Sequence, residues 1–401
     1  MSARIYNSIV KVLNLKEFDF VHLSRLALTN YRNYEYLDIR LPTGLIVFQG
    51  DNAQGKTNIL EAVYLLSISK AYRAKSDRET INKNANGNLT QVLGVGHRNN
   101  DDIRILVNIH RQNTYNESPQ TRIRKDIMIN GVSKLASDLV GTLKTVLFDA
   151  DDIRIITGSP MNRRRYLDIM ICQLDRSYLR SLQRYQKILY QRNHLLKLLR
   201  DKKAKPYEIE FWNKELISEG SYITFTRNNV IDSVTSIAKN IHSQLTDSKE
   251  QLEIQYVSNL NLFNPSQNDI AMVFASALED NIGKEISYGS SMLGPHRDDI
   301  VIKVGGLEAS TYASRGQART LALTLKLAEG EILTEDTGEK PILLLDDILS
   351  ELDVFRRRKL LEHVSESQQA MLSTTDLDVI EPQHLAHASI YLVNSGNVNL
   401  L

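Results

Sequence analysis

The sequence predicts an α/β fold with an antiparallel β section and a mainly helical second lobe. Three observations lead to this fold class. A glycine-rich loop stands between a strand and a helix at residues 44–66, strand patterns alternate over residues 90–129, and a long helical pattern covers residues 162–247. Apolar residues recur every 3.6 residues in a helix and every second residue in a strand, which separates the three stretches. The 401 residues exceed one ordinary domain, so we expect two lobes with their own cores.

The composition is that of a globular protein, with 42% hydrophobic and 24% charged residues. Because the net charge is only +1, any nucleic-acid surface must be a local patch. Cys172 is the only cysteine, which excludes an internal disulfide and a cysteine-based metal cluster. No apolar run approaches the roughly 18–20 residues of a membrane span, and charged residues break up any signal-peptide core near the start. We therefore expect a soluble cytoplasmic protein without a membrane partner.

Changes of pattern divide the chain into four parts. Residues 1–20 carry no motif and are interpreted as an N-terminal extension. Residues 21–150 hold the glycine-rich loop and form the first part of lobe I. Residues 151–290 form the helical lobe II, and residues 291–401 return to lobe I with the remaining nucleotide-site motifs.

Two strands are predicted ahead of the glycine-rich loop, at residues 21–28 and 35–41. The polar turn between them, residues 29–34, contains Arg32. This order places Arg32 near a bound nucleotide, although a solvated surface charge explains the residue equally well.

The glycine-rich loop reads GDNAQGKTN and satisfies the phosphate-loop pattern G-x-x-x-x-G-K-[ST]. Its glycines let main-chain N–H groups converge on phosphate oxygens, and the helix N-terminus adds partial positive charge. Lys56 would reach the β- and γ-phosphates, and the Thr57 hydroxyl would ligate Mg²⁺. A glycine turn that binds nothing is the alternative, but the flanking strand and helix favour a nucleoside triphosphate. The predicted nucleotide contacts are Gly50, Asp51, Asn52, Ala53, Gln54, Gly55, Lys56, Thr57 and Asn58.

The segment that follows the first helix, residues 70–78, is basic and contains one aromatic residue. Lys70 and Arg73 could hold a phosphate backbone there, and a solvated loop is the simpler interpretation. Strands are then expected at residues 92–95, 103–110 and 123–129, with a polar loop at residues 113–120. Asn130-Gly131 predicts a hairpin after the last of these strands.

One further strand is predicted at residues 144–148 before the composition changes to helix. The first half of the helical stretch is rich in Arg and Lys, with few acidic residues and four interleaved tyrosines. Such a mixture suits phosphate contacts, but a solvated helix face with tyrosines in the core accounts for it equally well. The DNA-binding candidates are Arg163, Arg164, Arg165, Arg180, Arg184 and Lys187.

Two later motifs complete the predicted site. Ser314, Arg315, Gly316 and Gln317 precede a helical run at residues 318–333, which makes a second anion site at a helix N-terminus. An apolar strand at residues 341–345 ends in two acids. Asp346 suits a partner of Thr57 that reaches Mg²⁺ through water, and Asp347 could orient or deprotonate the attacking water. Ser350 and Asp353 follow directly. Between these parts, His296 in the GPHRDD segment is interpreted as part of a Gly/Pro turn rather than a metal ligand.

The order of these motifs is that of ATP-binding-cassette (ABC) ATPases, and from about residue 23 onward the chain resembles the RecF family of the SMC-related branch. The resemblance is carried by LTNYRNY (28–34), GDNAQGKTNILEAVYLLS (50–67), GSPMNRRRYLD (158–168), GPHRDDI (294–300), SRGQARTLALTLKLAE (314–329) and PILLLDDILSELD (341–353). GSPMNRRRYLD and GPHRDD are not general features of cassette ATPases, which makes the resemblance specific.

The resemblance implies an ABC-type, SMC-like P-loop ATPase head that uses ATP and Mg²⁺. In such families the nucleotide lies between two heads, so residues 314–317 would act as a signature in trans, with Ser350 and Asp353 as the D-loop. The resemblance further implies an ATP-dependent homodimer with weak, DNA-stimulated ATPase activity. It implies sequence-independent binding to single-stranded DNA and to junctions of single- and double-stranded DNA. The corresponding roles are recombinational gap repair, replication restart and SOS induction, with RecR of the RecO pathway as protein partner.

The chain departs from the family pattern at several positions. Ala53 stands where the phosphate loop usually has its third glycine, and Ala150 stands where a proline is usual. The chain has no glutamine at the position that links the lobes in many cassette ATPases. Residues 373–375, Ser-Thr-Thr, take the place of a histidine after the last core strand.

Two other kinds of ATPase share these motifs. The alternative function is that of a soluble ATPase subunit of an ABC transporter, but more than 250 residues, in part basic, separate the phosphate loop from the signature here. A true SMC protein would carry a long coiled coil, whereas this insert is short and lacks sustained heptads.

Overall fold

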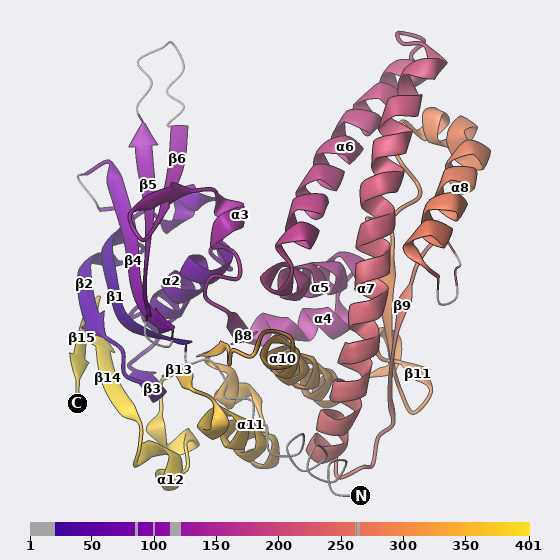
Figure 1. Ribbon diagram of the computed structural model, residues 1–401. Coiled ribbons are helices and arrows are strands. Elements are labelled where there is room, and N and C mark those ends of the chain that lie inside the picture. The colour runs from indigo at the N-terminus through magenta and orange to yellow at the C-terminus, as the bar shows by residue number, and fades with distance from the viewer. Residues whose placement is uncertain (1–20, 85–86, 99–100, 113–121, 261, 263–264) are drawn as a thin grey trace, which may run out of the picture.

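The computed structural model describes residues 21–84, 87–98, 101–112, 122–260, 262 and 265–401. Within these ranges the chain forms three sheets and a set of long helices, arranged as two lobes (Figure 1). The predicted N-terminal extension, residues 1–20, and the predicted polar loop, residues 113–120, lie outside the described residues.

A six-stranded sheet in the order β15-β14-β3-β13-β12-β8 forms the centre of lobe I. Neighbouring strands are parallel except for β14 and β15, which pair as an antiparallel hairpin. The strands predicted before the phosphate loop, before the paired acids and at residues 144–148 all lie in this sheet. Its members are β3 (Gly44–Gln49), β8 (Thr145–Asp149), β12 (Ile342–Asp346), β13 (Gln369–Thr374), β14 (Ser389–Asn394) and β15 (Asn397–Leu400).

Alternate residues of the central strands contribute to two different hydrophobic cores. Ile342 and Leu344 of β12 pack with α2 (Lys56–Ile68) and with the antiparallel sheet. Leu343 and Leu345 of the same strand pack with the helices of lobe II and with α10 (Arg315–Thr337). Because side chains alternate across a strand, a strand covered on both faces is apolar throughout. The central sheet therefore separates the two hydrophobic cores.

The antiparallel section is a second six-stranded sheet in the order β2-β1-β4-β5-β6-β7. The predicted hairpin is confirmed: β6 and β7 pair across Asn130 and Gly131, whose φ angles are 51° and 78°. Both angles are positive, as the tight two-residue turn of a hairpin requires. The strands are β1 (Val21–Tyr31), β2 (Tyr34–Arg40), β4 (Leu89–Arg98), β5 (Asp101–Gln112), β6 (Arg122–Ile129) and β7 (Val132–Lys134).

Lobe II is built from helices that project away from the central sheet, as predicted for residues 162–247 (Figure 1). The helix α6 runs alongside α7, and α8 packs against both. The members are α4 (Ile153–Thr157), α5 (Pro160–Leu174), α6 (Arg176–Arg200), α7 (Ile209–Leu245) and α8 (Gln267–Tyr288).

The predicted boundary between lobe II and the return to lobe I does not match the strand pairing. The strand β10 (Asp299–Val304) pairs with β9 (Leu252–Val257), and β11 (Leu307–Glu308) extends the same three-stranded sheet. Ile254 and Ile302 are register partners and are buried in the lobe II core. Residues 299–308 therefore belong to lobe II, and the chain returns to lobe I only at α10, after the short helix α9 (Ala309–Tyr312).

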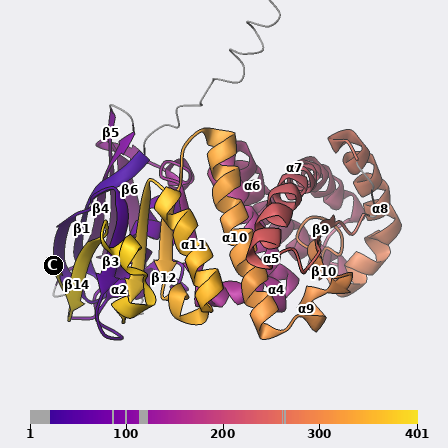
Figure 2. The ribbon, with the colours of Figure 1, turned by 90° about the horizontal axis from the view of Figure 1, so that it is seen from below.

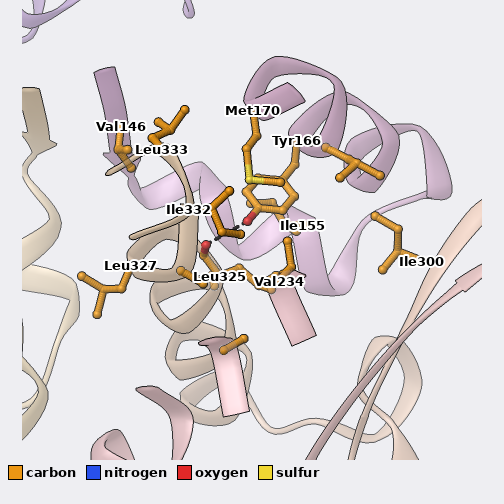
Figure 3. Close-up of a cluster of buried hydrophobic side chains, with 14 of the residues drawn as sticks. Val146, Ile155, Tyr166, Met170, Val234, Ile300, Leu325, Leu327, Ile332 and Leu333 are labelled. Carbon is orange, nitrogen blue, oxygen red and sulfur yellow. Dashed lines mark hydrogen bonds between the residues drawn. The ribbon is translucent and has the colours of Figure 1, made fainter. Parts of the chain in front are cut away.

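The helices α10 and α11 (Val354–Glu366) lie side by side next to the central sheet (Figure 2). Figure 3 shows how α10 meets lobe II, where Tyr166 and Met170 of α5 lie beside Ile332. The Tyr166 hydroxyl donates to the Leu325 carbonyl oxygen at 2.8 Å. Such a bond is needed because a buried tyrosine hydroxyl without a partner is costly.

An ion pair inside lobe II joins its three long helices. Arg192 of α6 and Glu285 of α8 are both completely buried and 2.5 Å apart at their nearest atoms. The guanidinium also donates to Asn213 of α7 at 2.7 Å and to Ser291 at 2.7 Å. A buried charge pair is tolerated when its remaining donors are satisfied, as they are here.

Replacing Glu285 with Gln should destabilise the protein by about 3 kcal/mol, because the Arg192 charge would remain buried without its counter-ion. Urea unfolding followed by circular dichroism measures this loss. Glu362→Gln, which removes one partner of the exposed pair with Lys359, is the control and should leave the midpoint nearly unchanged. Equal midpoints for wild type and Glu285→Gln would show that the pair contributes nothing to stability.

Candidate nucleotide-binding site

The phosphate loop joins β3 to α2, and two of its glycines are enforced by close contacts. A Cβ added to Gly50 would lie 2.2 Å from the Val393 carbonyl oxygen, and one added to Gly55 would lie 2.5 Å from Asn33 Nδ2. Gly55 also has a φ of 117°, which L side chains rarely adopt. Ala53, the departure from the family pattern, has a φ of 65°. Ala53 therefore adopts the left-handed backbone region, which costs a residue with a Cβ atom about 1 kcal/mol.

The start of α2 is suited to an anion. Gly55 is its N-cap, and the described residues provide neither a side-chain cap nor an acidic residue in the first turn. The first N–H groups of a helix have no partner inside the helix, and the helix dipole places positive charge beside them. A phosphate group at this position would satisfy these donors.

Residues outside the loop hold it in shape, and sequence reasoning missed them. Asn33 Nδ2 donates to the Gln54 carbonyl oxygen at 3.0 Å, and Asn58 Nδ2 donates to Asn33 Oδ1 at 2.7 Å. The Tyr34 hydroxyl donates to the Gly55 carbonyl oxygen at 3.0 Å. Asn33 and Tyr34 belong to the NYRNY segment of the sequence. The spacing of residues in that segment does not reveal that the turn before β2 contacts the phosphate loop.

Lys56 lies across the loop that it follows. Its Nζ donates to the carbonyl oxygens of Gly50 and Asp51 at 2.6 and 2.8 Å, and the residue is 7% exposed. Burial lowers the pKa of the Lys56 ammonium, while the nearby carboxylates of Asp347 and Asp346 act in the opposite direction. The ammonium group is therefore in position to exchange carbonyl partners for phosphate oxygens.

Asp346, at the end of β12, is the centre of the site. Its Oδ1 accepts from the hydroxyls of Thr57 at 2.7 Å and Ser373 at 2.8 Å, and its Oδ2 accepts from the Tyr72 hydroxyl at 2.7 Å. The structure thus brings Thr57 and Asp346 together as the sequence predicted. A hydroxyl and a carboxylate side by side are the oxygen ligands that Mg²⁺ uses in phosphate sites, so these two residues fit the ion and would hold it.

Asp347, the residue predicted to orient or deprotonate the attacking water, occupies a left-handed backbone position with a φ of 51°. Its N–H donates to the Ser373 hydroxyl at 3.0 Å, and the residue is exposed. Partial burial and then the adjacent Asp346 carboxylate raise the pKa of Asp347. A carboxylate with a raised pKa is a better proton acceptor, which suits the proposed base.

The D-loop candidates follow in the short helix η4 (Ile348–Glu351) and the start of α11. Ser350 Oγ donates to the Asp347 carbonyl oxygen at 2.8 Å. Asp353 caps α11 by accepting from the Arg356 N–H at 2.9 Å. Both residues are exposed.

Arg32, a predicted nucleotide contact, is bound to Glu61 of α2. Its Nε and Nη2 donate to the two carboxylate oxygens at 2.7 Å each, and Nη1 donates to the Glu79 carbonyl oxygen at 2.8 Å. Glu61 is completely buried and also accepts from the Tyr31 hydroxyl at 3.0 Å. Arg32 therefore fixes the turn between β1 and β2 to α2. Its contact with the nucleotide stays a prediction.

The signature residues stand at the start of α10 and are exposed from Ser314 to Gly316. Ser314 Oγ accepts from the Gln317 N–H at 3.2 Å, and Gln317 Oε1 accepts from the Ser314 N–H at 3.0 Å. This capping box leaves the N–H groups of Arg315 and Gly316 pointing out of the helix end without a described partner. Arg319 of the same helix forms an ion pair with Glu351 of the D-loop segment.

The structure corrects one predicted DNA contact in lobe II, Arg163, and shows a second, Arg164, in a hydrogen bond to the main chain. Arg163 is 6% exposed and binds Asp299 through both ends of its guanidinium, at 2.7 and 2.8 Å. Arg164 is half-buried and donates to the Asp298 carbonyl oxygen at 2.6 Å. Arg163 therefore links α5 to β10 as a structural residue, because β10 supplies a carboxylate that sequence spacing could not place beside it. Three of the four interleaved tyrosines, Tyr166, Tyr178 and Tyr185, are buried in the core, whereas Tyr190 is exposed.

The other basic candidates are on the surface. Arg165, Arg180, Arg184, Lys187, Lys70 and Arg73 are exposed. Lys70, from the segment after α2, and Arg164 and Arg165, from α5, line one cleft of ≈ 480 Å³ between the lobes. The structure thus brings together the edges of two basic segments that lie far apart in the sequence.

His296 is close to the side chain of Tyr185. Its Nδ1 lies 2.7 Å from the Tyr185 hydroxyl, and burial lowers its pKa to about 4. Among the described residues, no cluster of three or more potential ligands gathers around it. The described helices also include none with the length and apolar character to cross a bilayer.

These features define the class: an ABC-type ATPase head of the SMC-like kind, in which a phosphate loop, paired acids and a signature helix meet around one central sheet. Residues 22–395 match the RecF/RecN/SMC N-terminal domain family. Smc head domains share the fold: one from Pyrococcus furiosus superposes with a TM-score of 0.53 at 17% identity, over 95% of this chain and 96% of that one.

Comparison with relatives is more specific. The "DNA replication and repair protein RecF" of Clostridium novyi (strain NT) is 37% identical over 380 residues, which cover 94% of this chain and 100% of that protein. That of Staphylococcus aureus (strain JH9) is 36% identical, over 94% and 99%. A solved structure of "the recombination mediator protein RecF-ATPrS in RecFOR pathway" has a TM-score of 0.86 at 30% identity, over 96% of this chain and 100% of that one. The chain belongs to the RecF family.

Asp347→Asn should retain ATP binding but hydrolyse ATP about 10²–10⁴-fold more slowly, the range expected for loss of a general base. Phosphate release and equilibrium binding of a fluorescent ATP analogue measure the two properties. Asp346→Asn is the comparison and should weaken Mg²⁺-dependent binding instead. Hydrolysis by Asp347→Asn at the wild-type rate would move the catalytic role to another residue.

Proposed function

We propose that this chain is an ATP-dependent DNA-binding protein of recombinational gap repair, replication restart and SOS induction. The name of its relatives, DNA replication and repair protein RecF, supports the part in DNA repair, and the phosphate loop with Asp346 supports the use of ATP. ATP with Mg²⁺ drives association of two heads on DNA, and slow hydrolysis, stimulated by DNA, releases them. Its DNA is single-stranded or a junction of single- and double-stranded DNA, and its protein partner is RecR of the RecO pathway. The protein acts in the cytoplasm.

The observation that supports this proposal most strongly is the separation of two anion sites within one chain. The phosphate loop leads into α2, which packs on one face of the central sheet, whereas α10 packs on the other face. Both helix starts offer N–H groups for an anion. A second copy of the chain would bring its own Ser314–Gly316 end to the γ-phosphate held by the first. ATP would then join two molecules, and hydrolysis would remove the γ-phosphate that both molecules contact. The equilibrium between monomer and dimer would therefore shift with the nucleotide that is bound.

Ser314→Arg should abolish ATP-dependent dimerisation, because the longer cationic side chain would fill the space for the γ-phosphate at the helix start. Light scattering with ATP and Mg²⁺ distinguishes monomer from dimer. Ser276→Arg, on an exposed site of α8, adds the same side chain away from the proposed interface and should dimerise as wild type does. A dimer of unchanged stability in Ser314→Arg would rule out the arrangement in trans.

The exposed face of α6 is the better of the two proposed DNA surfaces. Arg180, Arg184 and Lys187 recur at helical spacing on this face, and all three are exposed. Within the described part of the chain, only Arg184 of the three has a carboxylate partner, Glu219 at 3.4 Å. Exposed cations with few counter-ions suit a phosphate backbone, which attracts them without regard to sequence. The cleft with Lys70 and Arg165 would continue this surface towards lobe I.

Reversing Arg180, Arg184 and Lys187 to Glu should weaken DNA binding and leave nucleotide binding intact. For each duplex phosphate that the variant no longer neutralises, the slope of log K against log salt should become shallower by about 0.9. Fluorescence anisotropy with gapped DNA, at several salt concentrations with and without ATP, measures both effects. Reversal of Lys214, Lys239 and Lys284, which are exposed on α7 and α8, is the charge-matched control. If both triple variants bind DNA equally well, the α6 face is only a solvated surface.

A further inference from the structure

Tyr72 makes a long-range contact with the centre of the nucleotide site. It lies in the segment between α2 and the short helix η1 (Asp77–Thr80), and its hydroxyl donates to Asp346 Oδ2 at 2.7 Å. The two residues are 274 positions apart in the sequence. Tyr72 is neither part of the phosphate loop nor one of the paired acids, so neither motif explains the contact.

The contact is the only described hydrogen bond to that oxygen. Asp346 Oδ1 accepts from Thr57 and from Ser373, whereas within the described part of the chain Oδ2 accepts from Tyr72 alone. Two oxygens fixed by donors from different directions define the plane of a carboxylate. Without the Tyr72 hydroxyl, the group could rotate about its last bond and would leave a nearly buried acceptor without a partner, which is costly.

The tyrosine is itself held in place. Its ring packs edge-on against Tyr64 of α2, with centroids 5.6 Å apart and an interplanar angle of 83°. It also lines the cleft between the lobes, where Arg165 and Ile169 of α5 stand on the other side. A tyrosine hydroxyl carries its proton at physiological pH, so Tyr72 is the donor and the Asp346 carboxylate the acceptor.

We propose that Tyr72 is a positioning residue of the nucleotide site. Its hydroxyl fixes the plane of the Asp346 carboxylate so that Oδ1 stays directed at Thr57, with which Asp346 would hold Mg²⁺. The ring packing fixes the hydroxyl before any ligand binds, which is the preorganisation that a metal site needs from its supporting residues. This inference rests on the ATP and Mg²⁺ site proposed above.

The test uses Tyr72→Phe, which removes only the hydroxyl, and Tyr64→Phe as the matched control. The Tyr64 hydroxyl stands in the same cleft and makes no hydrogen bond among the described residues. With the full chain and a non-hydrolysable ATP analogue, Mn²⁺ is titrated in place of Mg²⁺, and the free ion is followed by electron paramagnetic resonance. Nucleotide binding in the presence of a chelator is measured in parallel.

Tyr72→Phe should need about tenfold more Mn²⁺ for half-saturation, the effect of removing one hydrogen bond to a charged group. Its nucleotide binding in the chelator should match wild type, and Tyr64→Phe should match wild type throughout. Equal Mn²⁺ half-saturation in wild type and Tyr72→Phe, or an equal loss in both variants, would overturn the role of Tyr72. Wild-type protein that binds the nucleotide but takes up no Mn²⁺ would instead overturn the metal site itself.

Discussion

The arrangement of the nucleotide site depends on how one nearly buried carboxylate is satisfied. Asp346 is 7% exposed and receives three hydroxyl donors, from Thr57, Ser373 and Tyr72. Each donor comes from a different segment: the start of α2, the end of β13 and the loop after α2. A buried charge is tolerated only when hydrogen bonds replace its water. These three hydrogen bonds therefore offset the cost of burying the Asp346 charge. They also hold together the phosphate loop, the two central strands and the junction between the lobes.

A second constraint is the central sheet, whose strands are covered on both faces. Leu343 and Leu344 are neighbours in the sequence, yet they belong to different hydrophobic cores. One core carries α2 and the phosphate loop, and the other carries α10 and the signature. Because the strand between them cannot shift by one residue without exchanging its two faces, the register of β12 determines where both helix starts lie. The two halves of the proposed shared site are thus tied to one strand.

The elements that sequence analysis predicted were those with strong local signals. The phosphate loop, the acids after β12, the hairpin at Asn130-Gly131 and the helices of lobe II all follow from periodicity or turn chemistry. What it missed depends on contacts between distant segments. The pairing of β10 with β9 moved the lobe boundary, and the ion pair with Asp299 removed Arg163 from the DNA-binding candidates. Charge alone cannot distinguish a surface arginine from one that meets a carboxylate more than a hundred residues away.

The predicted signature and the segment after the paired acids are linked within the chain by an ion pair. Arg319 of α10 forms an ion pair with Glu351, which lies four residues after Asp347. On the other side of α10, Gln317 Nε2 donates to Glu250 at 2.8 Å, just beyond the end of α7. The start of α10 is therefore bound both to the segment that carries Asp347 and to the long helices of lobe II. A ligand that moves α6 and α7 relative to the central sheet would pull on α10, and through Arg319 on the D-loop. Any coupling between DNA on lobe II and hydrolysis at Asp347, as proposed, would involve this helix, since it contacts both parts of the chain.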